Sequence, residues 1–372
     1  MRTHPSPPEI SSSAGQLPAA LGLTAREFDA LAVAAGPYEI AYADLFRPKA
    51  SPALVAWARA VGVGLRVLQP LGHERGGASE KFLFGLRDGR AIESVLIRRH
   101  DGYTACVSSQ VGCAVACRFC ASGQAGLKRH LAPGEIVEQV LRLGKRVNRI
   151  VFMGIGEPLS NYDNVLKAIR ILRERRGLDF PTTGITISTI GIPDALRRLR
   201  EEHLAVNLTI SLHATTQETR DHLVPGARRH ALADVVRHAL AWADRHNRTV
   251  TFAYLLLPGV NDSPEDIVRL SALLAGRKAR VNLMRWNAVD GVRLPGTREK
   301  GLQRFRDRLE AAGVSAVVRD TRGRDIAAAC GQLWLRDARG VPVAAPSARR
   351  PERHSGQPPK PNPQIHEGGP PC

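Results

Sequence analysis

The sequence contains few aromatic residues and no long apolar run. Only 5% of its 372 residues are Phe, Trp or Tyr, so it offers no obvious platform on which nucleobases could stack. No stretch approaches the roughly 20 apolar residues of a transmembrane helix, and the N-terminal residues lack the apolar segment of a secretory signal. We therefore expect a cytoplasmic protein that does not contact a membrane.

Acidic residues are scarce relative to basic ones. Thirty-five Asp and Glu stand against 53 Lys and Arg, which gives a net charge of +18. A field of this sign favours a polyanionic partner such as RNA or DNA, although ordinary surface lysines and arginines would also explain it. The composition is therefore compatible with nucleic acid binding but does not require it.

The six cysteines are not expected to form a disulfide framework, because a cytoplasmic compartment keeps thiols reduced. Three of them, Cys113, Cys117 and Cys120, follow the spacing C-x3-C-x2-C within CVSSQVGCAVACRFCASG. Three thiolates on one loop can hold three irons of a four-iron cluster and leave the fourth iron open for a ligand. Structural zinc is the alternative, but it needs four ligands, and only His130 could complete the set. We predict one 4Fe–4S cluster.

Hydrophobic patterning divides the chain into four segments. Residues 1–16 are rich in Ser and Pro and are expected to be a disordered leader. Residues 17–80 contain two helical patterns, the first opened by a capping box at Thr24, and predict a small helical domain without a catalytic signal. Residues 81–335 carry the rest of the fold, and residues 336–372 form a proline-rich tail that is expected to be disordered.

Strand and helix patterns alternate within residues 81–335. Three strand patterns joined by Asp-Gly turns precede the cysteine loop, and five more alternate with helical patterns behind it. Together with the strand that leads into the loop, this makes six parallel strands and indicates an α/β sheet or barrel. The strands predicted after the loop are Arg149–Met153, Gly184–Thr189, Ala205–Leu212, Val250–Leu256 and Arg280–Trp286. A further helix and strand, Arg298–Ala312 and Val314–Arg319, lead to Cys330.

Polar residues occur at the ends of these predicted strands, where α/β folds place ligand sites. Gly156 and Glu157 lie in GIGEP, and a phosphate loop is a poor alternative because no Gly-Lys-Ser/Thr follows. The other members of this set are Ser188, Ser211, Leu212, His213 and Asn287. Taken alone, a Ser or Asn at a strand end is more often a turn or cap residue, and a single His is more often structural than a ligand. Their common position at one rim of the sheet predicts a shared cofactor site.

These motifs together resemble those of the radical SAM RNA adenine methyltransferases of the RlmN/Cfr family. The resemblance rests on CVSSQVGCAVACRFCASGQAGLKRHL, GIGEPLSN, SLHA and DIAAACGQL, and it runs from Glu93 to Trp334 in the family's order. It implies a six-stranded partial radical SAM barrel in which S-adenosylmethionine binds the open iron of the cluster. Gly156 and Glu157 would contact the methionyl amine, and the other strand-end residues would hold the carboxylate, ribose and adenine.

The resemblance also implies roles for two further cysteines, each of which would otherwise pass for a buried small hydrophobe. Two S-adenosylmethionine molecules would be used per turnover: one methylates the cysteine matching Cys330, and the second is cleaved to a 5′-deoxyadenosyl radical that activates the S-methyl group. After the resulting radical adds to the adenine ring, the cysteine matching Cys106 would resolve the adduct through a disulfide with Cys330. Glu93, in the otherwise apolar strand IESVLI, matches the base that removes the ring proton; an exposed strand glutamate is the alternative.

The substrate implied by the resemblance is carbon 2 of an adenine in 23S rRNA, with tRNA as a further substrate and flavodoxin or ferredoxin as electron donor. Carbon 8 is the alternative, because Gln124 resembles the carbon-2 branch whereas the Gly-Leu-Lys-Arg that follows the next alanine resembles the carbon-8 branch. A monomer is expected. Two other classes remain open: a radical SAM activase or methylthiotransferase, which would not need the pair Cys106 and Cys330, and a basic RNA-binding protein with a zinc-stabilised loop.

Overall fold

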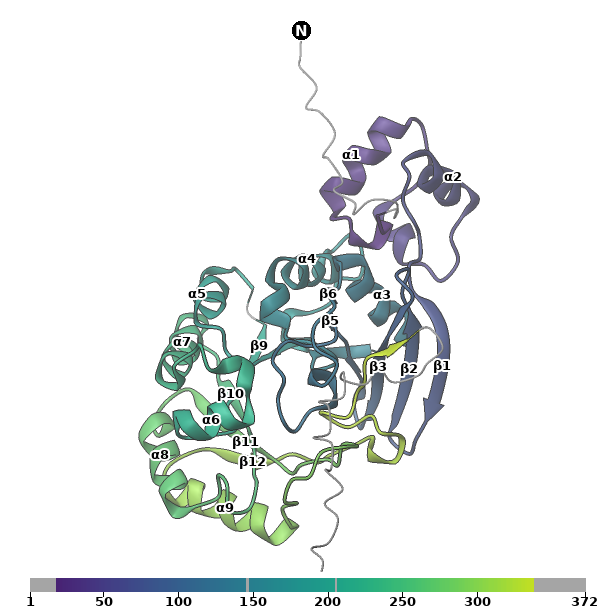
Figure 1. Ribbon diagram of the computed structural model, residues 1–372. Helices are drawn as coiled ribbons and strands as arrows, with labels where there is room; N and C mark the ends of the chain where they lie inside the picture. Colours follow the sequence, from purple (N-terminus) through teal and green to yellow (C-terminus); the bar gives the residue numbers. More distant parts are fainter. Residues whose placement is uncertain (1–17, 145–146, 205, 338–372) are drawn as a thin grey trace, which may run out of the picture.

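The structure, a computed structural model, describes residues 18–144, 147–204 and 206–337. The leader predicted at 1–16 and the tail from residue 338 onward, including Cys372, lie outside the described residues. Figure 1 shows a small helical segment at one end of the molecule and a large curved sheet with helices on its outer side. Among the described helices, none is both long enough and apolar enough to cross a bilayer.

The N-terminal segment packs around aromatic side chains. Helix α1 (Ala25–Ala35) begins at the predicted capping box, where the Thr24 hydroxyl accepts a hydrogen bond from the Glu27 backbone and the Glu27 carboxylate accepts one from Thr24. Helix α2 (Pro52–Ala60) follows, and the rings of Phe28 and Trp57 lie 4.9 Å apart between the two helices. The Lys167 ammonium forms a 2.8 Å ion pair with Glu27, which ties this segment to the sheet domain.

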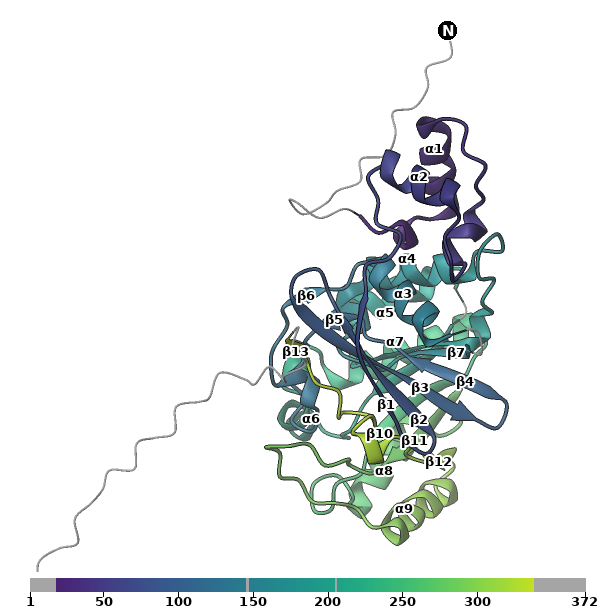
Figure 2. The same ribbon diagram turned by 90° about the vertical axis from the view of Figure 1, so that its right-hand side faces the viewer.

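The main sheet begins earlier in the chain than predicted. Residues 69–80, assigned from the sequence to the helical segment 17–80, instead form β1 (Gln69–Arg75) and the start of β2 (Ser79–Gly85). The side chains of β1 are exposed along its whole length, so its sequence lacks the alternation by which a half-buried strand is recognised. Its position is decided by pairing with β2. Figure 2 shows β1 and β2 beside β3 and β4.

The sheet joins an antiparallel part to a parallel part. Its strands follow the order β1-β2-β3-β4-β7-β8-β9-β10-β11-β12, antiparallel from β1 to β4 and parallel from β4 onward. The remaining strands of this path are β3 (Arg90–Arg99), β4 (Gly102–Cys106), β7 (Val147–Phe152), β8 (Ile185–Thr189), β9 (Asn207–Ser211), β10 (Val250–Leu255), β11 (Ala279–Met284) and β12 (Ala316–Val318). The six predicted parallel strands are confirmed, and β12 extends them at the edge.

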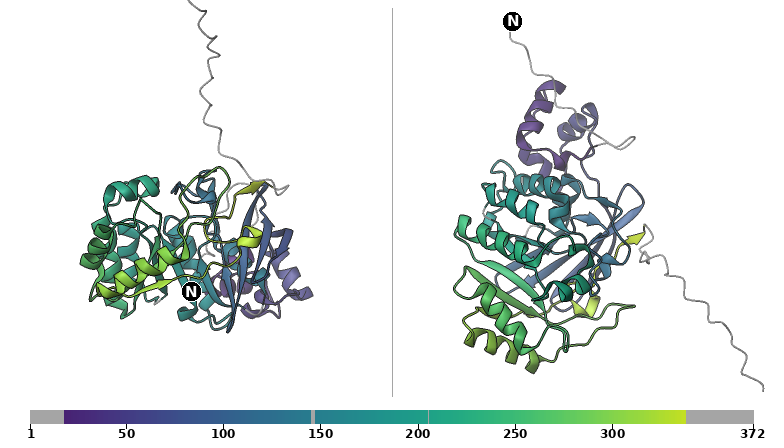
Figure 3. Two further views of the ribbon diagram at one scale, coloured as in Figure 1. Left: turned by 90° about the horizontal axis from the view of Figure 1, so that it is seen from below. Right: turned by 60° about the vertical axis from the view of Figure 1, so that its left-hand side comes forward.

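Helices cover the outer face of the parallel strands because each carries one apolar stripe. In α7, for example, the buried positions Leu232, Val235, Val236, Ala239 and Trp242 recur every three or four residues. The helices are α3 (Pro133–Leu143), α4 (Tyr162–Arg173), α5 (Pro193–Glu201), α6 (Gln217–Leu223), α7 (Leu232–His246), α8 (Pro264–Leu274) and α9 (Glu299–Ala311). The short helix α6 was not predicted. Figure 3 shows α8 and α9 at the end of the molecule opposite to the N-terminal helices.

Short elements complete the fold. The strands β5 (Gln110–Val111) and β6 (Arg129–His130) pair with each other on either side of the cysteine loop. The 3-10 helices are η1 (Ala20–Gly22), η2 (Tyr42–Phe46), η3 (Ala121–Gly123), η4 (Pro158–Asn161), η5 (Thr182–Gly184), η6 (Pro225–Ala227) and η7 (Arg324–Ile326). Strand β13 (Arg336–Asp337) pairs with Arg90 and Ala91 of β3, so the first two residues of the predicted tail belong to the sheet.

Candidate active site

A cavity of about 530 Å³ lies where the C-terminal ends of the parallel strands meet the cysteine loop. It brings together most of the predicted site residues from segments far apart in the sequence. Those lining it are Cys106, Cys113, Cys117, Cys120, Gly156, Glu157, Ser188, Ser211, His213, Asn287 and Cys330. Leu212 and Glu93 do not line it: the Leu212 side chain is buried in the main hydrophobic core.

The cysteine loop is held by main-chain hydrogen bonds to two distant segments. The Arg118 N–H donates to the Leu223 carbonyl at the end of α6, over 3.0 Å. The Ala121 N–H donates to the Gly331 carbonyl over 2.7 Å, and the Ser122 hydroxyl donates to the Leu333 carbonyl over 2.8 Å. These contacts fix the loop against α6 on one side and against the segment that carries Cys330 on the other.

The three loop cysteines are buried or partly buried, which disfavours their ionised form unless a cation is bound. Burial raises the pKa of Cys113 to about 12, and it also raises the pKa of Cys117 and Cys120. Buried thiolates need a bound cation, and a coordinating metal deprotonates such thiols outright. Within the described residues no three His, Cys, Asp or Glu side chains surround a single ion position; a four-iron cluster does not need that, since each thiolate binds a different iron.

The zinc alternative loses its fourth ligand in this arrangement. His130 lies in β6 and does not line the cavity. Its Nδ1 atom shares a 3.0 Å hydrogen bond with the Gln110 amide. A closed structural zinc site needs four protein ligands. With His130 elsewhere, the three cysteines lack the fourth ligand that the sequence had offered.

Glu157 places a buried carboxylate at the edge of the cavity. Its side chain accepts hydrogen bonds of 2.8 Å from the backbone N–H groups of Leu159 and Ile190. Burial nevertheless raises the pKa of Glu157, although these bonds and the charge of Arg220 act in the opposite direction. A bound ammonium group would stabilise the ionised carboxylate, as expected for the site of a methionyl amine.

The backbone before this carboxylate requires glycine. Gly156 has φ = +109°, a region that side chains disfavour. A Cβ atom at this position would lie 2.6 Å from the Gln110 Cβ atom. The close approach brings the Glu157 N–H to the Gln110 side-chain oxygen, over 2.8 Å, and thereby fixes the direction of the strand end.

His213 is a neutral hydrogen-bond donor at the cavity wall. Burial, assisted by the charge of Arg220, lowers its pKa to about 3. The Nδ1 atom accepts a 3.0 Å hydrogen bond from the Leu255 N–H, so the ring proton is on Nε2. The ring also packs edge-on against Phe119, with ring centroids 4.8 Å apart. In the sequence, Phe119 lies between Cys117 and Cys120.

Asn287 contacts the segment that carries Cys330. Its side-chain amide donates a 3.0 Å hydrogen bond to the Cys330 carbonyl, and its side-chain oxygen accepts one of 3.0 Å from the Arg324 guanidinium. These bonds position the Cys330 backbone over the cavity. Asn287 thus has a supporting role that the sequence did not indicate, in addition to lining the predicted cofactor site.

Cys106 and Cys330 are both free thiols in the same cavity, although they come from β4 and from the end of the described chain. Burial raises the pKa of Cys106 to about 12, and the neighbouring Cys330 adds to this effect. Cys330 also raises the pKa of Cys120, whose principal shift comes from burial. Cys330 therefore shares one cavity with Cys106 and with the cysteine loop, to which the next residue, Gly331, is hydrogen-bonded.

Glu93 is buried in β3, away from the cavity lining. Its two carboxylate oxygens accept hydrogen bonds of 2.8 Å from the Trp334 N–H and 2.7 Å from the Arg336 guanidinium. The Lys81 ammonium lies 3.9 Å away. In this arrangement Glu93 anchors the C-terminal segment to β3.

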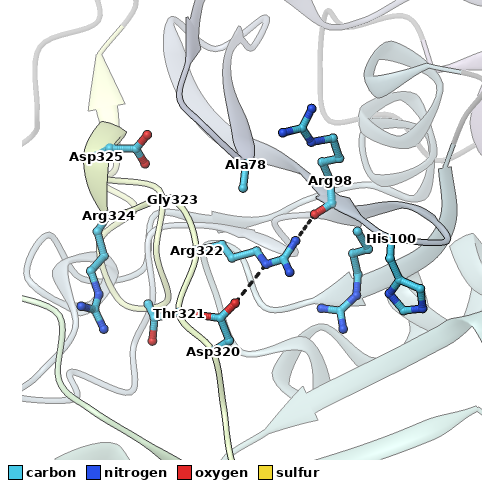
Figure 4. Close-up of a pocket in the computed structure, with 10 residues that line it drawn as sticks. Ala78, Arg98, His100, Asp320, Thr321, Arg322, Gly323, Arg324 and Asp325 are labelled. Atoms are coloured by element: carbon cyan, nitrogen blue, oxygen red, sulfur yellow. Dashed lines mark hydrogen bonds and ion pairs between the residues drawn. The ribbon is translucent and has the colours of Figure 1, made fainter. Parts of the chain in front are cut away.

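A second depression, which the sequence analysis missed, adjoins the cavity. This basic groove, of about 630 Å³, is lined by Ala78, Arg98, Arg99, His100, Asp320, Thr321, Arg322, Gly323, Arg324 and Asp325 (Figure 4). The Arg322 guanidinium donates to the Arg98 carbonyl and pairs with Asp320 at 3.3 Å. Arg99 and Arg322 also line the cavity, so the two spaces are adjacent. The available signal was the run Arg-Arg-His at the end of a predicted strand.

Comparisons with known proteins agree with this geometry. The family model of the radical SAM superfamily matches residues 107–271. The chain is 67% identical over 325 residues to a "Probable RNA methyltransferase" of Rhodopseudomonas palustris (strain BisB5), covering 87% of this chain and 90% of that protein. It is 45% identical over 276 residues to a "Probable dual-specificity RNA methyltransferase RlmN" of Symbiobacterium thermophilum, covering 72% and 74%.

A solved structure is similar over most of the fold. The crystal structure of a radical SAM methyltransferase from Sphaerobacter thermophilus superposes with a TM-score of 0.79 at 35% sequence identity. The match covers 85% of this chain and 99% of that chain. It therefore includes the parallel sheet together with much of what flanks it.

Proposed function

Because the chain belongs to the radical SAM RNA methyltransferases of the RlmN type, we propose that it methylates carbon 2 of an adenine in 23S rRNA, with tRNA as a further substrate. The observation that carries the proposal is the placement of Cys106 and Cys330 in one cavity with Cys113, Cys117 and Cys120. A radical SAM activase or methylthiotransferase would have no use for the first two thiols. A zinc-stabilised RNA-binding loop would not explain them either.

The cofactors would be held by the residues at the strand ends. Cys113, Cys117 and Cys120 would bind one 4Fe–4S cluster, and Glu157 would bind the methionyl ammonium of S-adenosylmethionine. Ser188, Ser211 and His213 offer hydroxyl and imidazole donors for the rest of that molecule. When bound, S-adenosylmethionine and the cluster would supply a methyl cation equivalent in one half of the reaction and a carbon radical in the other. Two S-adenosylmethionine molecules would be used per turnover.

Cys330 would carry the methyl group, and Cys106 would release the product. In the release step the Cys106 sulfur attacks the Cys330 sulfur, an S–S bond forms, and the bond from the Cys330 sulfur to carbon breaks. The carbon leaves with the electron pair and takes up the proton that the Cys106 thiol gives up. Burial raises the pKa of Cys106, so its thiol is protonated before this step.

The proton acceptor for the adenine ring would be Glu93. Since Trp334 and Arg336 hold its carboxylate, this role requires the C-terminal segment to move away from β3. Replacement Glu93→Gln tests this role. The melting temperature should fall in either case, because Arg336 loses its charged partner. If Glu93 is the base, the protein–RNA adduct also accumulates; if it serves only as an anchor, turnover per folded molecule stays the same.

The basic groove supports an RNA substrate. Single-stranded RNA presents one phosphate per nucleotide, and guanidinium groups bind phosphate with two hydrogen bonds each. Arg98, Arg99 and Arg324 line the groove, and Arg99 and Arg322 stand where the groove adjoins the cavity. The nucleotides flanking the target adenine would follow this groove, with the base directed toward Cys330. We further propose that the protein acts as a cytoplasmic monomer reduced by flavodoxin or ferredoxin.

The test is mass spectrometry of nucleosides from rRNA and tRNA after anaerobic incubation with reconstituted protein, S-adenosylmethionine and a reductant. We expect 2-methyladenosine. Appearance of 8-methyladenosine instead would place the reaction at carbon 8. Release of 5′-deoxyadenosine with neither product would contradict the proposed substrate while leaving the cofactor assignment intact.

A further inference from the structure

Arg220 is a fully buried arginine whose hydrogen-bonding capacity is largely unused. It lies in α6, and its side chain has no exposed surface. One terminal nitrogen donates a 2.5 Å hydrogen bond to the Ile190 carbonyl. The Nε and Nη1 groups have no partner among the described residues. A buried guanidinium in this state is costly, because its charge and its N–H groups have been removed from water without replacement.

The surroundings of Arg220 connect it to the cofactor site. Ile190, whose carbonyl it contacts, lines the cavity, and the Ile190 N–H donates to the Glu157 carboxylate. Helix α6 also receives the Arg118 N–H, which directly follows Cys117 in the cysteine loop. The guanidinium therefore lies behind the cavity wall, on the side of the cluster ligands.

The packing of α6 identifies the side to which Arg220 belongs. Leu223, one turn after Arg220 in the same helix, packs in a buried apolar cluster with Cys113 and Ile190, and the Cys117 side chain packs against that cluster. Burial lowers the pKa of Arg220, and the negative charges of Cys117, Asp221 and Glu157 oppose this effect. Arg220 therefore lies on the side of the predicted cluster ligands.

We propose that Arg220 is the cationic partner of the iron–sulfur cluster: its two unpaired N–H groups donate to sulfur on the Cys117 side, and its charge stabilises the reduced cluster. Hydrogen bonds to sulfur and nearby charge are the means by which a protein sets a cluster's reduction potential. Reduction adds negative charge to a site already bounded by three thiolates, and a buried cation acts strongly there because solvent screening is weak. The inference rests on the cofactor assignment within the proposed function, but not on the RNA substrate or on the Cys330 chemistry.

The decisive measurement is a redox titration of the reconstituted full-length protein, followed by electron paramagnetic resonance without S-adenosylmethionine or RNA. In Arg220→Met, which keeps an apolar side chain of similar reach, the reduction equilibrium constant should fall about tenfold or more, equivalent to 59 mV for a one-electron couple. Arg220→Lys should retain most of the wild-type potential. Arg228→Met is the matched control, because Arg228 is exposed on the segment that follows α6. The reduction potential of the cluster should not change in this variant.

Three results would overturn the proposal. An unchanged potential in Arg220→Met combined with weaker S-adenosylmethionine binding would assign Arg220 to the methionyl carboxylate. If Arg220→Met cannot retain iron, Arg220→Gln and Arg220→Lys become the comparison, and loss of iron from both would indicate a structural role. A wild-type chain that binds neither iron nor sulfide would remove the premise that a cluster is present. Absence of methylated adenosine, together with the expected fall in potential in Arg220→Met, would contradict only the proposed substrate.

Discussion

The cavity and the basic groove share an edge, but they present opposite physical environments. In the cavity, burial shifts the pKa of Cys106 and Glu157 upward and that of His213 downward, so each group is driven toward its neutral form. In the groove, Arg99 and Arg324 remain exposed to water. Interactions between buried charges are strong and insensitive to salt, whereas exposed charges are screened within about 10 Å. The comparison therefore predicts that cavity substitutions change chemistry and groove substitutions change affinity for RNA.

The largest effect is expected at the proposed methyl carrier. Cys330→Ala should lower formation of methylated adenosine by about 10³-fold or more, as loss of a covalent catalytic group does. Release of 5′-deoxyadenosine should continue, since the cluster cysteines remain in place. Cys106→Ala should instead accumulate a covalent protein–RNA species, visible as a shifted band on a denaturing gel. Persistent methylation in Cys330→Ala would contradict the cysteine mechanism.

The second largest effect concerns Glu157 and depends on pH. Only the ionised carboxylate can neutralise an ammonium group, so affinity for S-adenosylmethionine should rise with pH through the raised pKa of Glu157 and then level off. Glu157→Gln should weaken binding about 10- to 100-fold, the range of hydrogen bonds to charged groups, and should abolish this pH dependence. Equilibrium binding between pH 4 and 8 measures both, with the exposed Glu265→Gln as control. An unaltered pH profile in Glu157→Gln would assign the dependence to another group.

Groove substitutions should have smaller effects that depend on salt. Arg98→Ala and Arg99→Ala should each weaken RNA binding a few-fold and reduce the salt slope of log Kd by about 0.7 for each lost phosphate contact. The rate at saturating RNA should change little. Filter binding at several salt concentrations is the measurement, and Arg306→Ala on α9 is the control, because its guanidinium pairs with Asp307 away from the groove. Equal slopes in all three variants would mean that RNA follows another path.

The smallest effect on activity is expected outside both spaces. Thr24→Ala removes the capping box of α1 and should lower the free energy of unfolding by about 1 kcal/mol. Turnover per folded molecule should be unchanged, since Thr24 contacts neither the cavity nor the groove. Urea denaturation gives the stability change and nucleoside analysis gives the turnover. A matching loss of activity would show that the N-terminal segment contributes to substrate binding.

Local patterns in the chain were sufficient for the parallel strands, the helix α7 and the cluster motif. In each case the information lies within a few residues: a run of β-branched side chains, an apolar repeat of three or four, or three cysteines on one loop. Elements stabilised mainly by distant partners were missed. Strand β1 depends on β2, α6 depends on the cysteine loop, and β13 depends on β3, so their own sequences carry little periodicity.

The amino-acid sequence by itself therefore determined the cysteine spacing, the order of the parallel strands and the set of polar residues at their ends. Only the tertiary structure decided how those residues are partnered. It pairs Glu93 with Arg336, buries Arg220 in α6 without partners for two of its nitrogens, and hydrogen-bonds Arg322 to the Arg98 carbonyl at a groove. The physical reason is that burial and charge pairing are properties of groups brought together across the chain, and no local spacing encodes which groups will meet.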